Sequence, residues 1–287
     1  MPMTRILPFL FLLCLLPGLR LQAGEPDSRA TAAASSDSID KALFNVRYKM
    51  KSVNDTLKRK HHRETVVLQV GQHCSKFFSY TKFQTDSVLS IDKANNASLD
   101  VMLMHRRQYG TSQVSYQIYK RYPTGKTTTL DQFGTTVRVK VEEDSELPMW
   151  TLQSDTATVM TYACRKATCR FRGRNWIAWF TTQVPVSDGP WKLYGLPGLI
   201  LEAYDEQDHY HFSATALIQC RDESAITFDD KDRETVTPEE YRRLLERDNY
   251  DPLSFIMSSA GKEVKVYDES MNEVSFKDRP YNPIERE

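Results

Sequence analysis

The tripeptide His209-Tyr210-His211 carries the clearest metal-binding pattern in the sequence. On a β-strand both imidazoles would lie on one face, about 7 Å apart, and imidazole is a common ligand of transition metals. No group of histidines and cysteines has the tight spacing of a zinc knuckle. We therefore treat His209 and His211 as a candidate metal pair, against the favoured alternative of ordinary surface or packed histidines. The sequence indicates no cofactor.

Thiol chemistry is the second candidate. Cys74, Cys164, Cys169 and Cys220 form an even set, which permits disulfides if the chain is exported, as its N-terminal pattern suggests below. A catalytic cysteine would need a histidine brought near by folding, and the residue pattern indicates no reactive surroundings. Cys164 and Cys169 would face opposite sides of an unbroken strand. We expect a disulfide from Cys164 to Cys220 or to Cys74, with buried free thiols as the alternative.

Adjacent carboxylates could act in acid–base catalysis, and they occur at 142–143, 229–230 and 239–240. Each pair stands in a charged, loop-like or helix-start setting, which favours solvated side chains and helix caps. The segment 123–129 is similar to the end of a phosphate loop, but Lys120 stands where that motif needs an earlier glycine. We assign no catalytic residue.

Large aromatic side chains gather in and after the segment 175–181, Asn-Trp-Ile-Ala-Trp-Phe-Thr. Alternation on a strand puts Trp176 and Phe180 on one face and Trp179 on the other. Core packing is the default interpretation, but a curled sheet would turn one face into an apolar groove with aromatic rings at its mouth. The candidate ligand-lining residues are Trp176, Trp179, Phe180, Trp191 and Tyr194.

The glycine-rich stretch 189–201, GPWKLYGLPGLIL, could be a phosphate loop, a catalytic elbow or a turn. A phosphate loop precedes a helix, whereas Leu199 here begins a strand-like run. A nucleophile elbow needs Gly-x-Ser-x-Gly, and the stretch contains no serine. Pro197 and Gly198 suit the two central positions of a type II turn. The stretch therefore predicts a turn that feeds a strand and touches no substrate.

The elements that must position these residues are mainly strands. The segment 42–50 alternates apolar and polar residues, and strand-like runs follow one another closely from Val114 onward. Short connections at 172–175 and 205–208 indicate hairpins, and no amphipathic helix of about 12 residues separates the runs as a parallel sheet would require. The sheet should therefore be antiparallel.

Helices are a minor component. Thr237, Pro238 and Glu240 match an N-cap, a first helical position and a capping box, so a helix should start there. The segment 85–107 is either helical or irregular, and 263–268 should be a last strand. The fold class is α+β, mainly β: a curved antiparallel sheet with one or two helices packed against it.

The N-terminus resembles a secretory signal peptide. Arg5 precedes an uncharged apolar run from Ile6 to Leu16, which is too short to span a bilayer, and a small-residue cleavage site follows near Ala23. We expect export to the periplasm, the cell surface or the extracellular space, with at most peripheral membrane contact. The expected organisation is a signal peptide over 1–23, a flexible leader over 24–38, one β-rich domain over 39–270 and a polar tail over 271–287.

Charge excludes one class of function. The whole chain has 38 basic and 38 acidic residues, and removal of Arg5 and Arg20 with the signal peptide leaves 36 against 38, a net charge of −2. Nucleic-acid binding normally requires a basic excess, so we expect no nucleic-acid partner.

The heptapeptide GLPGLIL, with the preceding CRKATCRFRGRNWIAWFTTQVPVSDGPWKLY, resembles the signature of the GLPGLI family of exported bacterial proteins. The resemblance is close from Trp150 to Phe212. It implies an envelope protein whose family has no established activity, and a layout similar to lipoprotein carriers. The signature residues of structural interest are Gly173, Arg174, Gly189, Pro190, Gly195, Leu196, Pro197, Gly198 and Leu199.

We therefore expect a non-enzymatic envelope module that binds or carries an apolar or peptide ligand, or a partner protein. An envelope hydrolase built around the polar residues of the signature is the first alternative, and a metal-handling protein is the second. A buried Cys–His or His–carboxylate group in a cleft would favour the hydrolase.

Overall fold

The computed structural model describes residues 37–57, 60–134, 136–221, 224–255, 270–273 and 280–286. The predicted signal peptide and the predicted last strand, 263–268, lie outside these residues. The described part is mainly β, as expected, and its helices are α1 (Tyr80–Ala94), α2 (Leu99–Tyr109) and α3 (Pro238–Tyr250). The strands are β1 (Asp37–Asp55), β2 (Lys60–Gly71), β3 (Ser75–Ser79), β4 (Gln117–Lys120), β5 (Lys126–Phe133), β6 (Val137–Asp144), β7 (Thr151–Val159), β8 (Tyr162–Phe171), β9 (Arg174–Thr181), β10 (Leu199–Asp205), β11 (Tyr210–Gln219), β12 (Ala225–Phe228) and β13 (Glu234–Val236).

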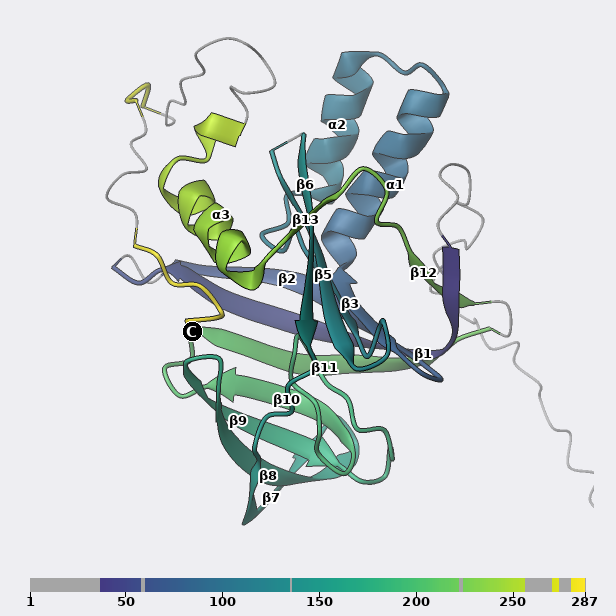
Figure 1. The fold of residues 1–287 in the computed structure, drawn as a ribbon, viewed down its shortest axis with the longest axis vertical. Helices are drawn as coiled ribbons and strands as arrows, with labels where there is room; N and C mark the ends of the chain where they lie inside the picture. Colours follow the sequence, from purple (N-terminus) through teal and green to yellow (C-terminus); the bar gives the residue numbers. More distant parts are fainter. Residues whose placement is uncertain are drawn as a thin grey trace, which may run out of the picture. The chain divides into compact units, whose positions relative to one another are not determined.

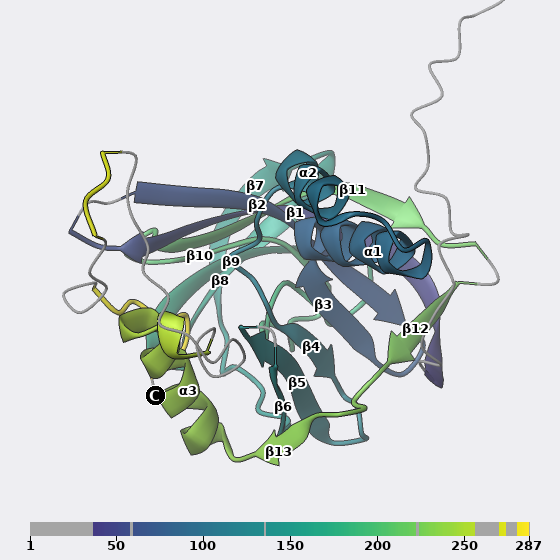
Figure 2. The same ribbon diagram turned by 90° about the horizontal axis from the view of Figure 1, so that it is seen from above.

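The strands form one open sheet in the order β13-β6-β5-β4-β3-β2-β1-β11-β10-β9-β8-β7, with β12 beside β1. Each pairing of these strands is antiparallel except that of β13 with β6, which is parallel. Figure 1 shows β5 and β6 at a steep angle to β1 and β2. The sheet therefore bends strongly between the part that contains β5 and β6 and the part that contains β1 and β2. Figure 2 shows the same strands from above, with α3 and the α1–α2 pair over different parts of the sheet.

Strand β1 connects the strands β2 to β6 with the strands β7 to β11, because it pairs with β2 on one side and with β11 on the other. Its alternation buries Val46, Tyr48 and Met50 on one face, as the sequence predicts. These side chains join one large core cluster with residues of β2, β8, β9 and β10. The Tyr48 hydroxyl donates to the Ile200 carbonyl at 2.7 Å, which ties β1 to β10.

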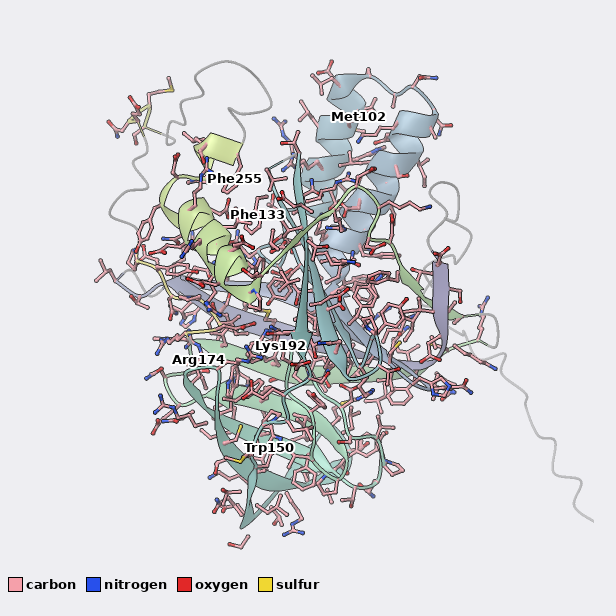
Figure 3. The ribbon with its side chains drawn as sticks, in the orientation of Figure 1. Met102, Phe133, Trp150, Arg174, Lys192 and Phe255 are labelled. Carbon is pink, nitrogen blue, oxygen red and sulfur yellow. The ribbon has the colours of Figure 1, made fainter. Side chains whose placement is uncertain are left out.

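The described residues contain three helices beside the sheet, where one or two were expected. The ambiguous segment 85–107 forms most of α1 and α2, whose first turns are capped by Ser79 and Ser98. Local serine caps can therefore select helix where apolar periodicity is weak. Helix α3 begins at Thr237 with the predicted capping box, and Figure 3 shows Phe133 and Phe255 beside it.

The signature forms a turn, but not the type II turn expected from Pro197 and Gly198. Gly195 has a left-handed backbone, with φ of 95°, whereas Gly198 has φ of 159°, far from the value of about 80° that a type II turn needs. The Gly198 amide donates to the Leu196 carbonyl at 2.8 Å. Gly198 is required for a different reason: a Cβ there would lie 2.1 Å from the Thr181 carbonyl oxygen. The glycine therefore allows the turn to press against the end of β9.

The predicted disulfides are wrong. Cys74, Cys164, Cys169 and Cys220 are all free thiols. Cys164 lies on β8, separated from β11 by β9 and β10, whereas Cys74 and Cys220 pack in a separate apolar cluster. Burial raises the pKa of Cys74 and of Cys169 to about 12, so these thiols stay protonated.

None of the helices within the described ranges combines the length and the apolar character that crossing a bilayer requires.

Candidate functional site

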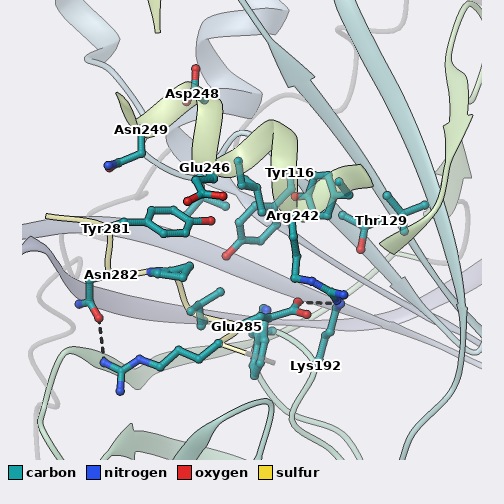
Figure 4. Close-up of a pocket in the computed structure, with 18 of the residues that line it drawn as sticks. Tyr116, Thr129, Lys192, Arg242, Glu246, Asp248, Asn249, Tyr281, Asn282 and Glu285 are labelled. Carbon is teal, nitrogen blue, oxygen red and sulfur yellow. Dashed lines mark hydrogen bonds and ion pairs between the residues drawn. The ribbon is translucent and has the colours of Figure 1, made fainter. Parts of the chain in front are cut away.

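A cleft of about 780 Å³ opens between one face of the sheet, helix α3 and the segment Tyr281–Arg286, which we call the strap. Strands β1, β5 and β6 contribute Met50, Thr129 and Val141 to its floor. Figure 4 shows α3 along one wall and the strap along the other. The cleft is thus built by elements that are distant in sequence.

The lining combines aromatic rings with charges of both signs. Burial, aided by the negative charge of Glu246, raises the pKa of Tyr281 to about 12, so its phenol remains a hydrogen-bond donor at neutral pH. The aromatic lining residues are Tyr116, Trp191, Tyr210, Tyr241 and Tyr281. The charged lining residues are Glu143, Lys192, Glu239, Arg242, Arg243, Glu246, Asp248, Glu285 and Arg286.

A charged network joins the strap to the sheet. Lys192 forms ion pairs with Glu143 and, at 2.7 Å, with Glu285 of the strap. Arg172 contacts the same two carboxylates at 3.1 and 3.7 Å. The four side chains are between 8% and 18% exposed, so their charges are mutually compensated in a largely water-excluded place.

Local backbone geometry positions the two cations. Arg172 and Gly173 form a two-residue hairpin loop between β8 and β9, and both have positive φ, 50° and 72°. Two consecutive left-handed residues are typical of the tight turn that matches strand twist. Lys192 follows Trp191, which has φ of 52°, in a turn closed by a 3.0 Å bond from the Leu193 amide to the Pro190 carbonyl. Arginine and tryptophan rarely adopt this backbone, which is common at functional sites.

The second network is centred on Arg174, which is fully buried. Its guanidinium donates to Asp205 at 2.7 Å and to the Asn282 side-chain oxygen at 2.9 Å. It also donates to the carbonyls of Pro283 and, at 3.0 Å, Ile284. The predicted signature residue Arg174 is therefore a structural cation that the strap largely satisfies.

Two buried aspartates outside the lining of the cleft have different surroundings. Asp188 forms an ion pair with the fully buried Lys120 and another, at 2.9 Å, with Arg121. Burial alone would raise the pKa of Asp188, but these two cations outweigh it and hold the pKa below its ordinary value. Asp131, under α3, accepts from the Tyr241 hydroxyl at 2.7 Å, and burial raises the pKa of this carboxyl.

The predicted ligand-lining aromatics divide between core and cleft. Trp176 and Phe180 are buried in the main core, with the Trp176 ring 5.5 Å from that of Trp191. Trp191 lines the cleft, and Trp176 also borders a smaller hollow of about 380 Å³ near β7. Trp179 is half-buried, Tyr194 is buried, and neither lines either cavity. The sheet face that was expected to form a groove is thus mostly filled by side chains.

The candidate metal pair acquires no third ligand among the described residues. His211 contacts Glu202 at 2.8 Å and Asp208 at 3.1 Å, and His209 lies half-buried just before β11. Within the part of the chain that the structure describes, no three His, Cys, Asp or Glu side chains are grouped so that they could hold a metal ion.

The same histidine has contacts that could suggest a hydrolase. Ser213 Oγ lies 3.2 Å from His211 Nε2, while Asp208 contacts Nδ1. Glu202, however, makes the shorter contact to Nε2, at 2.8 Å, and thereby competes with the serine. None of these residues lines the cleft or the smaller hollow.

Sequence reasoning misses the residues that join the strap to the cleft. Its charged surroundings predict a solvated Glu143, yet the side chain is 10% exposed and ion-paired twice. Asn282 and Glu285 fall in the predicted polar tail, because no periodicity marks a segment without regular secondary structure. The one available signal was Lys192, a charge inside an otherwise apolar, glycine-rich stretch.

Comparison with known proteins adds little about chemistry. Residues 172–202 match a family described as "Protein of unknown function (Porph_ging)". This short segment contains four charged residues of the two networks and the buried aspartate site described above: Arg172, Arg174, Asp188 and Lys192. The chain matches none of the curated proteins with which it was compared.

Two solved structures of PNGF-II, in different crystal forms, are similar to the chain at a TM-score of 0.48 and 0.47, both with 12% sequence identity. They cover 72% of this chain, but only 34% and 33% of the PNGF-II chains. The chain thus corresponds to about a third of PNGF-II. A likeness this weak supports no inference about fold or activity.

Proposed function

We propose that this protein is a non-enzymatic binding module of the cell envelope, and that its cleft takes a peptide segment of a partner protein. The observation that carries the proposal is the cleft itself, whose lining combines aromatic side chains with paired charges of both signs. Peptides present both apolar side chains and hydrogen-bonding backbone groups, and such a lining can satisfy both kinds of group.

A purely apolar cargo fits this cleft less well. Lys192, Glu143 and Glu285 would be covered by the cargo and lose their remaining contact with water, which costs free energy without any compensating bond. A role as a lipoprotein carrier is correspondingly less well supported than peptide binding.

Membership of the GLPGLI family is part of the same proposal. It is supported by the heptapeptide 195–201, which lies in the short segment that matches a family of unknown function. Export is supported by the apolar N-terminal pattern of residues 1–23. Cleavage after Ala23 predicts a mature chain that begins at Gly24, and intact mass of protein recovered from the envelope tests this.

The binding test uses the full mature chain and an array of twelve-residue peptides of varied sequence. A subset should bind, and Arg242→Glu, on the α3 wall of the cleft, should weaken that subset at least tenfold. Arg165→Glu is the matched control, because Arg165 is exposed on β8 outside both cavities, and it should leave binding unchanged within twofold.

Two results would contradict the proposal. Equal binding by Arg242→Glu and wild type would place the peptides elsewhere on the molecule. Recovery of bound peptides as cleaved fragments, detected by mass spectrometry, would replace the binding module with a hydrolase.

A further inference from the structure

The strap lies on the sheet as a bound peptide would lie in a groove. Its Asn282 is buried. The Asn282 side-chain oxygen accepts hydrogen bonds from Arg174 and Arg286, and its side-chain nitrogen donates to the Val53 carbonyl at 2.5 Å. The Tyr210 hydroxyl donates to the Asn282 carbonyl at 2.7 Å. One asparagine thus has its amide and its backbone carbonyl recognised at once.

Two further anchors follow along the strap. Ile284 packs against the main apolar core, and Glu285 forms its ion pairs with Lys192 and Arg172. The Arg286 amide donates to the Arg172 carbonyl at 3.1 Å, and the strap passes so close to Gly173 that a Cβ there would lie 2.6 Å from that of Arg286. Together these contacts recognise three side chains in order: an asparagine, an aliphatic residue two positions later, and a carboxylate directly after it.

The groove that reads this pattern is defined by the residues contacting the strap: Val53, Arg172, Gly173, Arg174, Lys192 and Tyr210. Four of the six belong to the short family-matched segment. With the strap in place Arg174 is 2% exposed; without the strap it would keep Asp205, and water would have to replace its other acceptors. An occupied groove therefore offers Arg174 ordered acceptors that it lacks when the strap is absent.

We infer that this groove is a peptide-recognition site for segments of the pattern Asn-Pro-aliphatic-acidic, and that the strap is its resident occupant, exchangeable for such a segment of a partner protein. The inference deepens the proposed function and rests on it, since it names the peptide chemistry and the wall of the cleft that such a peptide would form. A partner segment would restore each bond that the departing strap gives up.

The strap is covalently attached, and attachment gives a segment an effective concentration in the millimolar range. A free peptide must therefore compete with it, and weakening the strap should expose the site. The probe is the strap hexapeptide itself, Tyr-Asn-Pro-Ile-Glu-Arg, labelled with fluorescein and followed by anisotropy.

The full chain carrying Asn282→Ala and Glu285→Ala should bind this probe at least tenfold more tightly than wild type. The same variant should bind Tyr-Ala-Pro-Ile-Ala-Arg at least tenfold more weakly than the probe. Equal affinity for both peptides, or no binding by a variant that still unfolds cooperatively, overturns the inference and identifies the strap as a permanent part of the fold.

A second variant keeps the test decisive if the double substitution prevents folding. Glu285→Lys retains the Asn282 anchor and loosens one end of the strap by placing a lysine against Lys192. It should bind the probe more tightly than wild type, and adding Lys192→Glu should reverse the preference toward Tyr-Asn-Pro-Ile-Lys-Arg. A preference that does not follow residue 192 overturns the inference.

Failure of the two ideas can be told apart. Array peptides that bind through Arg242 while the hexapeptide binds no variant would overturn the strap inference and leave the proposed function standing. Absence of binding by both sets of peptides would remove both.

Discussion

Asp188 and Asp131 are both buried, yet the two regions that bury them treat the charge in opposite ways. Asp188 lies in the signature region, residues 172–202, where Lys120 and Arg121 more than offset its burial and keep its pKa low. Asp131 lies under α3 and meets hydroxyl groups and a backbone amide, so burial prevails and its pKa rises. A neutral hydrogen bond stabilises a buried charge less than a neighbouring cation does.

The comparison shows which region is built around fixed charge. In the signature region Arg172, Arg174 and Lys192 are cations with carboxylate partners, and losing one partner leaves a charge uncompensated. In the α3 region, Phe133, Tyr241 and Phe255 pack as an apolar cluster, and a capping box stabilises the first turn of the helix. Substitutions should therefore cost more free energy of unfolding in the signature region.

Asp188→Asn should have the largest effect. It leaves Lys120 charged and buried without its carboxylate, and breaking a buried pair in this way costs about 3–5 kcal/mol. Urea unfolding at pH 7 measures the loss. The pKa of Asp188 is lower in the folded than in the unfolded protein. Its contribution to the free energy of unfolding is therefore present above the unfolded-state pKa and is lost as pH falls through the folded-state pKa. The gap between wild type and variant should therefore narrow in acid, and a constant gap would contradict this account.

Gly198→Ala should come next, at about 3 kcal/mol, because the new methyl group would overlap the Thr181 carbonyl and force the backbone apart. Gly110→Ala is the matched control. Gly110 has φ of 85°, but a methyl group there would meet no atom of the described residues within 4 Å, so the variant should show only backbone strain of about 1–2 kcal/mol. Thermal melts of the two variants give the order, and equal losses would show that close packing at Gly198 is unimportant.

Thr237→Ala should cost about 1 kcal/mol, since it removes the side-chain bond to the Glu240 amide at the start of α3. Thr237→Ser keeps the hydroxyl and should restore most of the stability. Chemical denaturation of both variants is the measurement. A serine variant as unstable as the alanine variant would mean that the methyl group, not the cap, matters.

Asp131→Asn should have the smallest effect and the opposite sign. At pH 7 the variant should be more stable than wild type by less than about 1 kcal/mol, because an amide can still accept from Tyr241 without burying a charge. The pKa of Asp131 is higher in the folded than in the unfolded protein. Its protonated carboxyl therefore contributes fully to the free energy of unfolding below the unfolded-state pKa, and this contribution is lost as pH rises through the folded-state pKa. The free energy of unfolding of wild type should therefore rise relative to that of the variant as pH falls from about 7 to about 4. Curves of unfolding free energy against pH that stay parallel would contradict a raised pKa at Asp131.

Much of the fold follows from local patterns. Alternation predicts β1 and the long run of antiparallel strands, and the Arg172–Gly173 hairpin lies where the sequence indicates it. The capping box at Thr237 predicts the first turn of α3 because it is a contact among residues three positions apart. Where the pattern is weak, as in residues 85–107, the helices depend on serine caps and on packing.

The candidate site could not be predicted to the same degree. The glycines of the signature do lie in turns, as predicted, but which glycine needs a left-handed backbone depends on how the turn packs against β9. Trp176 and Phe180 are candidates for a ligand groove because strand alternation identifies a face, and it cannot say whether that face meets a cavity or another layer of side chains.

The sequence by itself determined what depends on near neighbours: the strands, the hairpins, the cap of α3 and the turn-forming nature of the signature. Only the tertiary structure decided that Glu143, Lys192 and Glu285 meet in a cleft, that Cys164 packs in a different cluster from Cys74 and Cys220, and that the strap satisfies Arg174. Arg174 and Asn282 are 108 positions apart. Contacts over such separations are set by the bend of the whole sheet, which no local pattern encodes.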